Sequence, residues 1–189
     1  MTLSEIYRLS GTRRLPVDPV EIARALDFKV VDYKAAAELF DIDIRGLYSR
    51  CPLGFSFKED ETLCIALNEN ACGEQRRRFT AAHELAHCVL GHLNDSEPFS
   101  KRQEREADRF AARLLAPLVV LHECNVRSAK EIARICGISN QAAENRLTEL
   151  AERERSGFVL SEDEARIAEM FREFTESVAA APKRRGKRL

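Results

Sequence analysis

Apolar residues repeat along the chain with two different periods, which separates predicted helices from predicted strands. In "PVDPVEIARAL" Asp18 is a suitable N-cap, Pro19 suits the first helical position, and apolar residues recur every three or four positions. The "FKVVDY" that follows is typical of a strand. Glycine, proline and the polar turn "KEDET" divide "GLYSRCPLGFSFKEDETLCIALNEN" into short β-rich runs, which predicts a small antiparallel sheet.

The second half of the chain has the helical period almost throughout. Helices are predicted over 75–90 and over about 102–115. "SAKEIARICGISNQAAENRLTELAERE" predicts two short helices around Gly137, and "SEDEARIAEMFREFTESVAAA" one final amphipathic helix capped by Ser161. The predicted fold class is therefore α+β and mainly helical.

Length and composition indicate an ordinary globular protein. The chain has 189 residues, of which 44% are hydrophobic and 32% charged, enough for one domain with a core or a domain with a small appendage. No apolar stretch is long enough to cross a bilayer, and the N-terminus has no signal-peptide pattern. We therefore expect a cytoplasmic location.

Cysteine usage and charge exclude some other classes. The six cysteines are scattered without a CxxC pair, so we expect most of them to be reduced core residues rather than disulfides or zinc ligands. The net charge is −1, although the tail "KRRGKRL" carries five basic residues, so the rest of the chain is clearly acidic. This balance provides no broad surface for nucleic acid.

The stretch "TAAHELAHCVLGH" contains the chemistry-bearing residues. His83 and His87 are four residues apart, so on a helix both project from one face and can bind one metal ion. Glu84 lies beside them, placed to hold a water on the metal. A catalytic zinc site needs three protein ligands, however, and the alternative is that both residues are ordinary helix histidines.

The predicted helix over 102–115 offers a third ligand. At 100° per residue its apolar residues form one buried arc, which contains Glu104 and has Asp108 at its edge. Glu106 falls on the opposite side among arginines. We therefore assign Glu104 as the third ligand and Asp108 as the acceptor for the free ring N–H of a liganding histidine. The alternative for both is a salt bridge at the helix edge.

At this point the residues resemble a known family. "RRFTAAHELAHCVLGH" followed by "EREADRFAARLLAP" resembles the ImmA/IrrE family of zinc metallopeptidases, whose HExxH helix precedes an E-x-x-A-[ND]-x-F-A helix and a Leu-Leu-x-Pro turn. The similarity covers roughly residues 15–150, with "LLAP" in place of the more usual Leu-Leu-Met-Pro. It implies a zincin-like fold and one Zn²⁺ ion held by His83, His87 and Glu104, with Glu84 catalytic.

These observations predict a zinc-dependent endopeptidase of the gluzincin type, in which zinc polarises the scissile carbonyl and Glu84 transfers the proton. His92, His122 and Tyr48 are candidates for a second electrophile, although each is expected to be structural. The strand "TLCIAL" either pairs with an extended substrate or is an ordinary core strand.

We expect three parts: a metallopeptidase domain over 1–125, a helix-turn-helix-like segment over 126–156, and an amphipathic helix with a basic tail over 157–189. The Ala133–Gly137 spacing is typical of a helix-turn-helix, and the helix after it offers Asn140, Gln141, Asn145 and Arg146 as base contacts. We favour packing against the catalytic domain over DNA binding, because no basic face is evident. The tail is expected to be a mobile, solubilising end.

The resemblance also implies a biological setting. Members of the family act in bacterial or phage cytoplasm and are associated with cleavage of helix-turn-helix repressors, which switches on mobile-element or stress genes. A repressor is therefore the expected protein substrate, and no membrane partner is expected. The competing hypothesis is a transcriptional regulator that binds DNA or protein and uses the zinc site as a sensor or structural element.

Overall fold

A computed structural model of the chain describes residues 1–71, 73–94 and 99–180. The three strands are β1 (Lys29–Asp32), β2 (Gly54–Glu59) and β3 (Thr62–Leu67). The helices are α1 (Leu3–Ser10), α2 (Pro19–Ala25), α3 (Tyr33–Phe40), α4 (Ile44–Arg50), α5 (Glu74–Val89), α6 (Lys101–Leu115), α7 (Leu118–Glu123), α8 (Ala129–Cys136), α9 (Asn140–Arg155), α10 (Glu162–Met170) and α11 (Arg172–Ala180), with one 3₁₀ turn, η1 (His92–Asn94). The predicted α+β, mainly helical class is confirmed.

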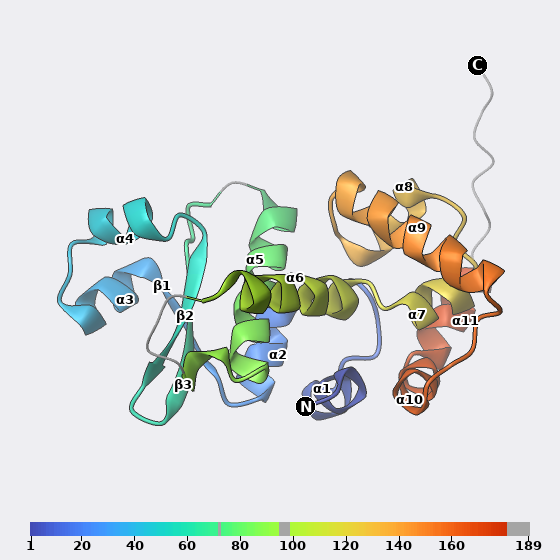
Figure 1. Cartoon of the computed structure of the whole chain (residues 1–189), viewed down its shortest axis with the longest axis horizontal. Coiled ribbons are helices and arrows are strands. Elements are labelled where there is room, and N and C mark those ends of the chain that lie inside the picture. Colours follow the sequence, from blue (N-terminus) through green and yellow to red (C-terminus); the bar gives the residue numbers. More distant parts are fainter. Residues whose placement is uncertain (72, 95–98, 181–189) are drawn as a thin grey trace, which may run out of the picture.

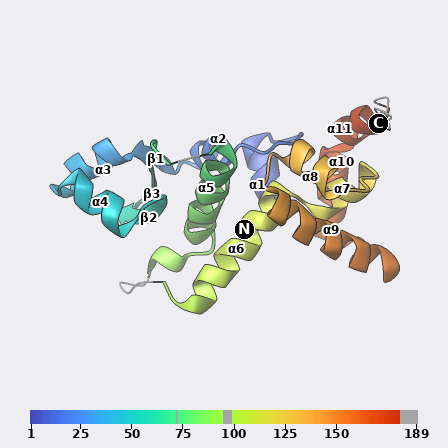
Figure 2. The same cartoon turned by 90° about the horizontal axis from the view of Figure 1, so that it is seen from above.

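The molecule is elongated, and its elements are spread along the long axis, with α1 beside α10 (Figure 1). The sheet with α3 and α4 lies at one end, α7 to α11 lie at the other, and α5 and α6 lie between them in both views (Figure 2). Within the described part of the chain, no helix combines the length and apolar character needed to cross a membrane.

The sheet is mixed, which corrects the antiparallel sheet predicted from the sequence. Its strand order is β1-β3-β2, with β2 antiparallel to β3 but β1 parallel to it. Parallel strands need a long crossover. The α3–α4 pair provides it, since it lies between β1 and the other two strands in the chain. Because β3 is central and paired on both sides, "TLCIAL" is the core strand of the two alternatives and has no free edge for a substrate, whereas β2 is an edge strand.

Aspartate N-caps explain two helices that the sequence pattern missed. Asp32 accepts a hydrogen bond from the backbone N–H of Ala35 and begins α3, so the predicted strand ends there. Asp43 caps α4 in the same way through Arg45, which makes "GLYSR" helical rather than β-rich. α1 also begins with a capping box, between Thr2 and Glu5.

The predicted C-terminal helix is two helices, because the chain turns at Phe171. Phe171 is fully buried, and its ring meets Tyr7 of α1 edge-on with 5.2 Å between ring centroids. The basic tail predicted at the C-terminus lies outside the described residues.

One hydrophobic core runs through most of the molecule. It joins buried residues of α1, α5, α6, α8, α9 and α10, including Ile6, Leu85, Leu114, Ile132, Leu150 and Ile167. A smaller cluster lies between the sheet and α3 and α4 around Tyr33 and Ala66. Helix α5 and the C-terminal helices therefore share packing, and neither buries its apolar face alone.

The cysteines behave as expected of reduced core residues. Cys64, Cys88, Cys124 and Cys136 are free and buried, and Cys51 is free and half-buried. Burial raises the pKa of the Cys88 thiol to about 12, which makes it a poor nucleophile and ligand at neutral pH. Cys72 lies outside the described residues.

Candidate metal centre

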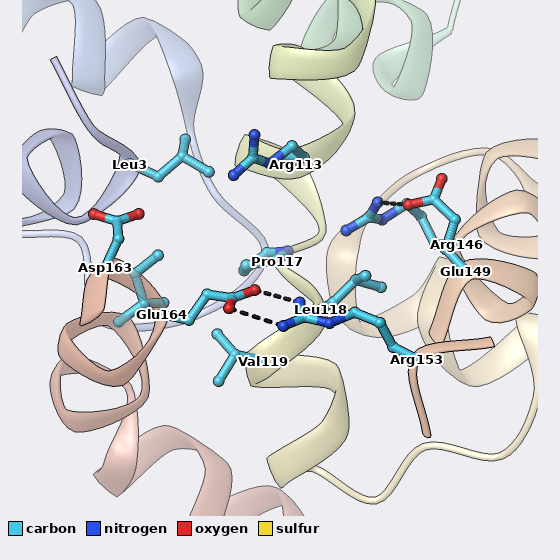
Figure 3. A pocket seen from close by; sticks show the side chains of 11 residues that line it. Leu3, Arg113, Pro117, Leu118, Val119, Arg146, Glu149, Arg153, Asp163 and Glu164 are labelled. Carbon is cyan, nitrogen blue, oxygen red and sulfur yellow. Dashed lines mark hydrogen bonds and ion pairs between the residues drawn. The ribbon is translucent and has the colours of Figure 1, made fainter. Parts of the chain in front are cut away.

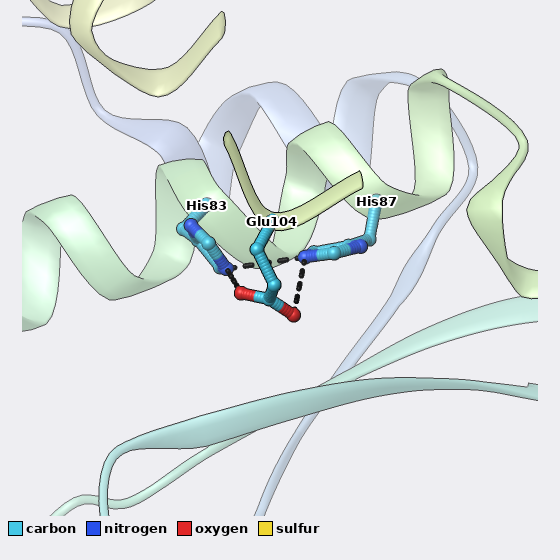
Figure 4. A group of neighbouring side chains, drawn as sticks. All are labelled: His83, His87 and Glu104. Carbon is cyan, nitrogen blue, oxygen red and sulfur yellow. Dashed lines mark hydrogen bonds and ion pairs between the residues drawn. The ribbon is translucent and has the colours of Figure 1, made fainter. Parts of the chain in front are cut away.

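Helices α5 and α6 pack side by side and bring the two predicted half-sites together. α5 carries His83 and His87 on the face that meets α6, while Glu104 lies in the first turn of α6 (Figure 4). A capping box between Ser100 and Gln103 fixes the start of α6 and thus the direction from which Glu104 approaches.

The three side chains converge on one point. Nε2 of His83 lies 3.3 Å from Oε2 of Glu104, Nε2 of His87 lies 3.8 Å from Oε1, and the two Nε2 atoms are 3.1 Å apart. Ligands at tetrahedral angles around zinc, each about 2.0 to 2.1 Å from the ion, are separated by about 3.3 Å. Two imidazoles and one carboxylate at this spacing fit a single zinc ion, with a position left open for water.

Glu104 is less buried than the helix phase predicted. Its side chain is 47% exposed, whereas those of His83 and His87 are 16% and 1% exposed. Glu104 does face α5, as the phase argument required. However, the first turn of α6 lies at the rim of the core, where the carboxylate remains open to solvent.

Both histidines also have a partner at the ring nitrogen that faces away from Glu104. Nδ1 of His83 lies 2.9 Å from Oδ1 of Asp108, and Nδ1 of His87 lies 3.0 Å from Nδ1 of His92. The Asp108 contact joins the two residues for which such a hydrogen bond was predicted from the sequence. Contacts at Nδ1 hold each ring so that Nε2 is free for a metal.

Burial keeps His87 in the form that binds metals. Desolvation, together with the nearby imidazoles of His83 and His92, lowers the pKa of His87 to about 3, so it is neutral at physiological pH. The ring of Phe99 stacks on that of His87 with 3.8 Å between centroids and 15° between planes. This stacking fixes the plane of the imidazole.

Glu84 lies in a sheltered position beside the three candidate ligands. Its side chain is buried, and burial raises its pKa, while Ser56 of β2 and the neighbouring His83 partly offset the rise. A raised pKa makes the Glu84 carboxylate a stronger base than an ordinary glutamate, which favours proton transfer from water.

A cleft of about 360 Å³ opens beside α5 and includes His83, Glu84 and Asp108. Its other lining residues come from the segment between α4 and β2 and from α5: Arg50, Cys51, Pro52, Leu53, Gly54, Phe79 and Thr80. The cleft therefore joins the candidate metal centre to the start of the edge strand β2.

The three candidates for a second electrophile do not line this cleft. His92 contacts His87 on the side away from Glu104. His122 donates a 3.0 Å hydrogen bond from Nδ1 to the Glu154 carboxylate and stacks on Phe158, and Tyr48 contacts Glu69 and Asn70. Arg50 is the cationic side chain that lines the cleft instead.

The sequence predicted Glu106 on a solvated face among arginines. In the structure Glu106 contacts both an arginine and a histidine. Glu106 pairs with Arg102 at 2.8 Å, as its neighbours suggested. Its Oε2 atom also lies 3.5 Å from Nε2 of His92. The contact was missed because His92 follows the end of α5, where helical spacing no longer predicts direction.

The helix-turn-helix-like segment contacts the rest of the protein through Arg146, one of the four residues predicted as base contacts. Arg146 is only 4% exposed, and it donates hydrogen bonds of 3.0 and 2.7 Å to the backbone oxygen of Ala116 at the end of α6. Asn140, Gln141 and Asn145 are exposed, but so is Glu144 beside them. Residues 126–156 carry six basic and five acidic side chains, so the segment has little excess positive charge for contact with phosphate.

A second cavity, of about 190 Å³, lies among α1, α7, α9 and α10 (Figure 3). Two ion pairs line it: Arg153 with Glu164, and Arg146 with Glu149. It contains none of the residues predicted for the metal site.

The chain matches the model of a known protein family. The family model for peptidase M78, described as the IrrE N-terminal-like domain, matches residues 33–148, which is more than half of the chain. The matched range includes all three candidate ligands. No curated protein matches the chain.

Proposed function

Because the chain belongs to the ImmA/IrrE family of metallopeptidases, peptidase M78, we propose that it is a zinc-dependent endopeptidase that cleaves a helix-turn-helix repressor at a specific site. The observation that carries the proposal is the convergence of His83, His87 and Glu104 from two helices, with Glu84 sheltered next to them. The family implies a protein substrate. Zinc as the ion and a repressor as the substrate are part of the proposal.

The chemistry is divided between the metal and Glu84. A bound zinc ion would act as a Lewis acid that polarises the scissile carbonyl and makes water a better nucleophile. Glu84 orients the attacking water, accepts its proton and passes that proton to the nitrogen of the leaving amine. The raised pKa of Glu84 suits this transfer, because the same carboxyl must be a base in one step and an acid in the next. Asp108 keeps His83 oriented through Nδ1.

An extended substrate segment would lie along β2. This strand is at the edge of the sheet, its residue Ser56 neighbours Glu84, and its first residue, Gly54, lines the cleft. An edge strand offers unpaired backbone N–H and C=O groups that a peptide can pair with. Substrate pairing there would bring a backbone carbonyl toward the metal centre without any change in the sheet.

The cleft walls suggest how the substrate is held next to the scissile bond. Pro52, Leu53 and Phe79 provide an apolar wall, and the Phe79 side chain is already 37% exposed. Arg50 is exposed at the same cleft. We expect the wall to accept an apolar side chain and Arg50 to contact a substrate carbonyl or carboxylate.

We further propose that residues 1–125 form the catalytic part, that 126–156 pack on it as a structural segment, and that 157–189 extend it. The near-balanced charge of 126–156 and the buried Arg146 favour this role over duplex binding. They weigh against the alternative of a DNA-binding regulator that uses zinc as a sensor.

The test is cleavage in vitro. The purified chain is assayed for bound zinc and then incubated with the repressor encoded by the neighbouring gene, with Glu84→Gln as the inactive control. We expect one defined cut by the wild-type protein and none by the variant. Specific duplex binding with no cleavage would instead support the regulator hypothesis.

A further inference from the structure

We propose that His92 and Glu106 form a hydrogen-bonded relay that positions His87 as a metal ligand. The inference rests on the proposed function, since it concerns the same metal centre. It gives His92 a role that neither the sequence pattern nor the helix phase predicted, and it makes Glu106 part of the site rather than a purely surface residue.

The relay is a continuous series of polar contacts. Nδ1 of His87 lies 3.0 Å from Nδ1 of His92, and Nε2 of His92 lies 3.5 Å from Oε2 of Glu106. The carboxylate is held in turn by Arg102, whose Nε lies 2.8 Å from Oε1. The series thus runs from the candidate metal centre to the surface of α6.

The positions of the protons follow from the role of His87. Its Nε2 faces His83 and Glu104. If Nε2 is to bind a metal ion, the proton of the neutral ring must be on Nδ1. Nδ1–H then donates to Nδ1 of His92, which must offer a lone pair. The proton of His92 is therefore on Nε2, the nitrogen that faces Glu106. Reversing the first bond would put a proton on Nε2 of His87, where it would block the metal.

Burial makes this contact hard to replace with water. The side chains of His87 and His92 are only 1% and 7% exposed, and Phe99 stacks on His87. Gly91, with φ of 74°, turns the chain directly after α5 so that His92 comes back alongside the helix. A donor left without an acceptor in such a place costs free energy and allows the ring to rotate.

The two liganding histidines are therefore supported differently. His83 contacts the carboxylate of Asp108, whose side chain is 58% exposed, whereas His87 contacts the buried imidazole of His92. Water can substitute for Asp108 but not for His92. We accordingly expect the buried His92 contact to contribute more to metal affinity than the exposed Asp108 contact does.

The experiment compares zinc affinity, by competition with a chelator, and the visible absorption spectrum of the Co²⁺-loaded protein. His92→Phe keeps an aromatic ring but removes both nitrogens, while His92→Asn keeps an acceptor near the place of Nδ1. His122→Phe makes the same change far from the site and is the matched control. We expect about a 10- to 100-fold loss of zinc affinity and an altered Co²⁺ spectrum in His92→Phe, recovery of most of the affinity in His92→Asn, and no change in His122→Phe.

Two results would overturn the relay: wild-type zinc affinity and spectrum in His92→Phe, or equal losses in His92→Phe and His92→Asn, which would indicate packing alone. If the metal-free His92→Phe protein does not fold, Glu106→Ala decides, because it leaves His92 in place. Weaker zinc binding in Glu106→Ala supports the relay, and unchanged binding refutes it.

The readout is metal binding rather than cleavage, so the two proposals can fail separately. A protein that needs His92 to bind zinc but cuts no repressor keeps the relay and loses the proposed function. Repressor cleavage with zinc affinity independent of His92 keeps the proposed function and refutes the relay.

Discussion

Nε2 of His83 and Oε2 of Glu104 lie 3.3 Å apart although the two residues belong to different helices. Their proximity depends on how α5 and α6 pack, and the far end of α6 is held by residues distant in sequence. The Tyr7 hydroxyl donates to the Leu114 carbonyl and Arg146 donates to that of Ala116. These contacts satisfy carbonyls that a helix C-terminus leaves without partners, so the metal centre depends on the whole packed core.

Glu84→Gln should abolish cleavage and leave zinc binding intact. The amide cannot accept the proton of the attacking water, and Glu84 is not one of the three convergent ligands. We expect the rate of repressor cleavage to fall about 10²- to 10⁴-fold. Metal content and cleavage rate are measured on the same preparation, with Glu144→Gln on α9 as control. Substantial cleavage by Glu84→Gln would exclude Glu84 as the base.

Glu104→Ala should lose zinc, whereas Glu106→Ala should retain it with weaker affinity. Removing Glu104 leaves only two histidines as ligands. The loss of zinc affinity should therefore exceed the loss of about 10- to 100-fold that is typical when a residue contacting a ligand is removed. Both carboxylates lie on α6, which makes the pair a matched comparison. Zinc titration of the two metal-free proteins checks this, and full occupancy in Glu104→Ala would require another third ligand.

Arg146→Met should destabilise the fold, with a cost of about 2 to 4 kcal/mol in the free energy of unfolding. Methionine fills much of the space but leaves the Ala116 carbonyl without its donor. Urea unfolding measures the loss, with exposed Arg155→Met as the control. A DNA-binding role for Arg146 would instead leave stability unchanged and reduce duplex affinity.

The Arg153–Glu164 pair should make stability depend on pH in the acid range. The Arg153 guanidinium lowers the pKa of Glu164 from 4.5 to about 2. Because the folded-state pKa is below the unfolded one, the pair stabilises the fold above about pH 4.5, and this stabilisation is lost as pH falls toward 2.

Glu164→Gln should therefore lose about 1 to 2 kcal/mol at neutral pH, and this difference from the wild-type protein should shrink at acid pH. Glu162→Gln, whose side chain is 83% exposed, is the control on the same helix. A difference that is the same at pH 2.5 and pH 7 would show that the ion pair is not its cause.

Gly137→Ala should be more costly than Gly157→Ala. Both glycines have positive φ, 63° and 75°, so alanine is strained at either position by about 1 kcal/mol. At Gly137 a Cβ atom would also clash with Nη1 of Arg78, which donates to the Gly137 carbonyl, whereas nothing lies near Gly157. Thermal unfolding of both variants separates the backbone strain from the clash with Arg78. Equal losses of stability would show that the clash with Arg78 adds nothing to the cost of the backbone strain.

The sequence predicted the residues of the candidate site better than it predicted the pairing of the strands. Spacing within one helix placed His83 and His87 together, and the phase of the next helix directed Glu104 toward them, because both arguments use local geometry. Strand partners are set by tertiary packing, so the parallel β1–β3 pairing and the edge position of β2 were not predictable from alternation.

His92 shows the same limit at the level of one residue. It follows Gly91, where the helix ends, and the direction of its side chain is set by a backbone turn rather than by a period. The break at Phe171 has a comparable cause, since its burial against Tyr7 overrides a pattern that favours one continuous helix.

The exposed edge of β2 also affects how the protein behaves at high concentration. Unpaired strand edges are templates for self-association as well as for peptides, and β2 is only six residues long and carries Lys58 and Glu59 near its end. Short length and charge both limit edge-to-edge aggregation. Pairing at this edge should therefore be brief and weak, which would suit the proposed substrate surface, because the pieces of a cut chain must be released.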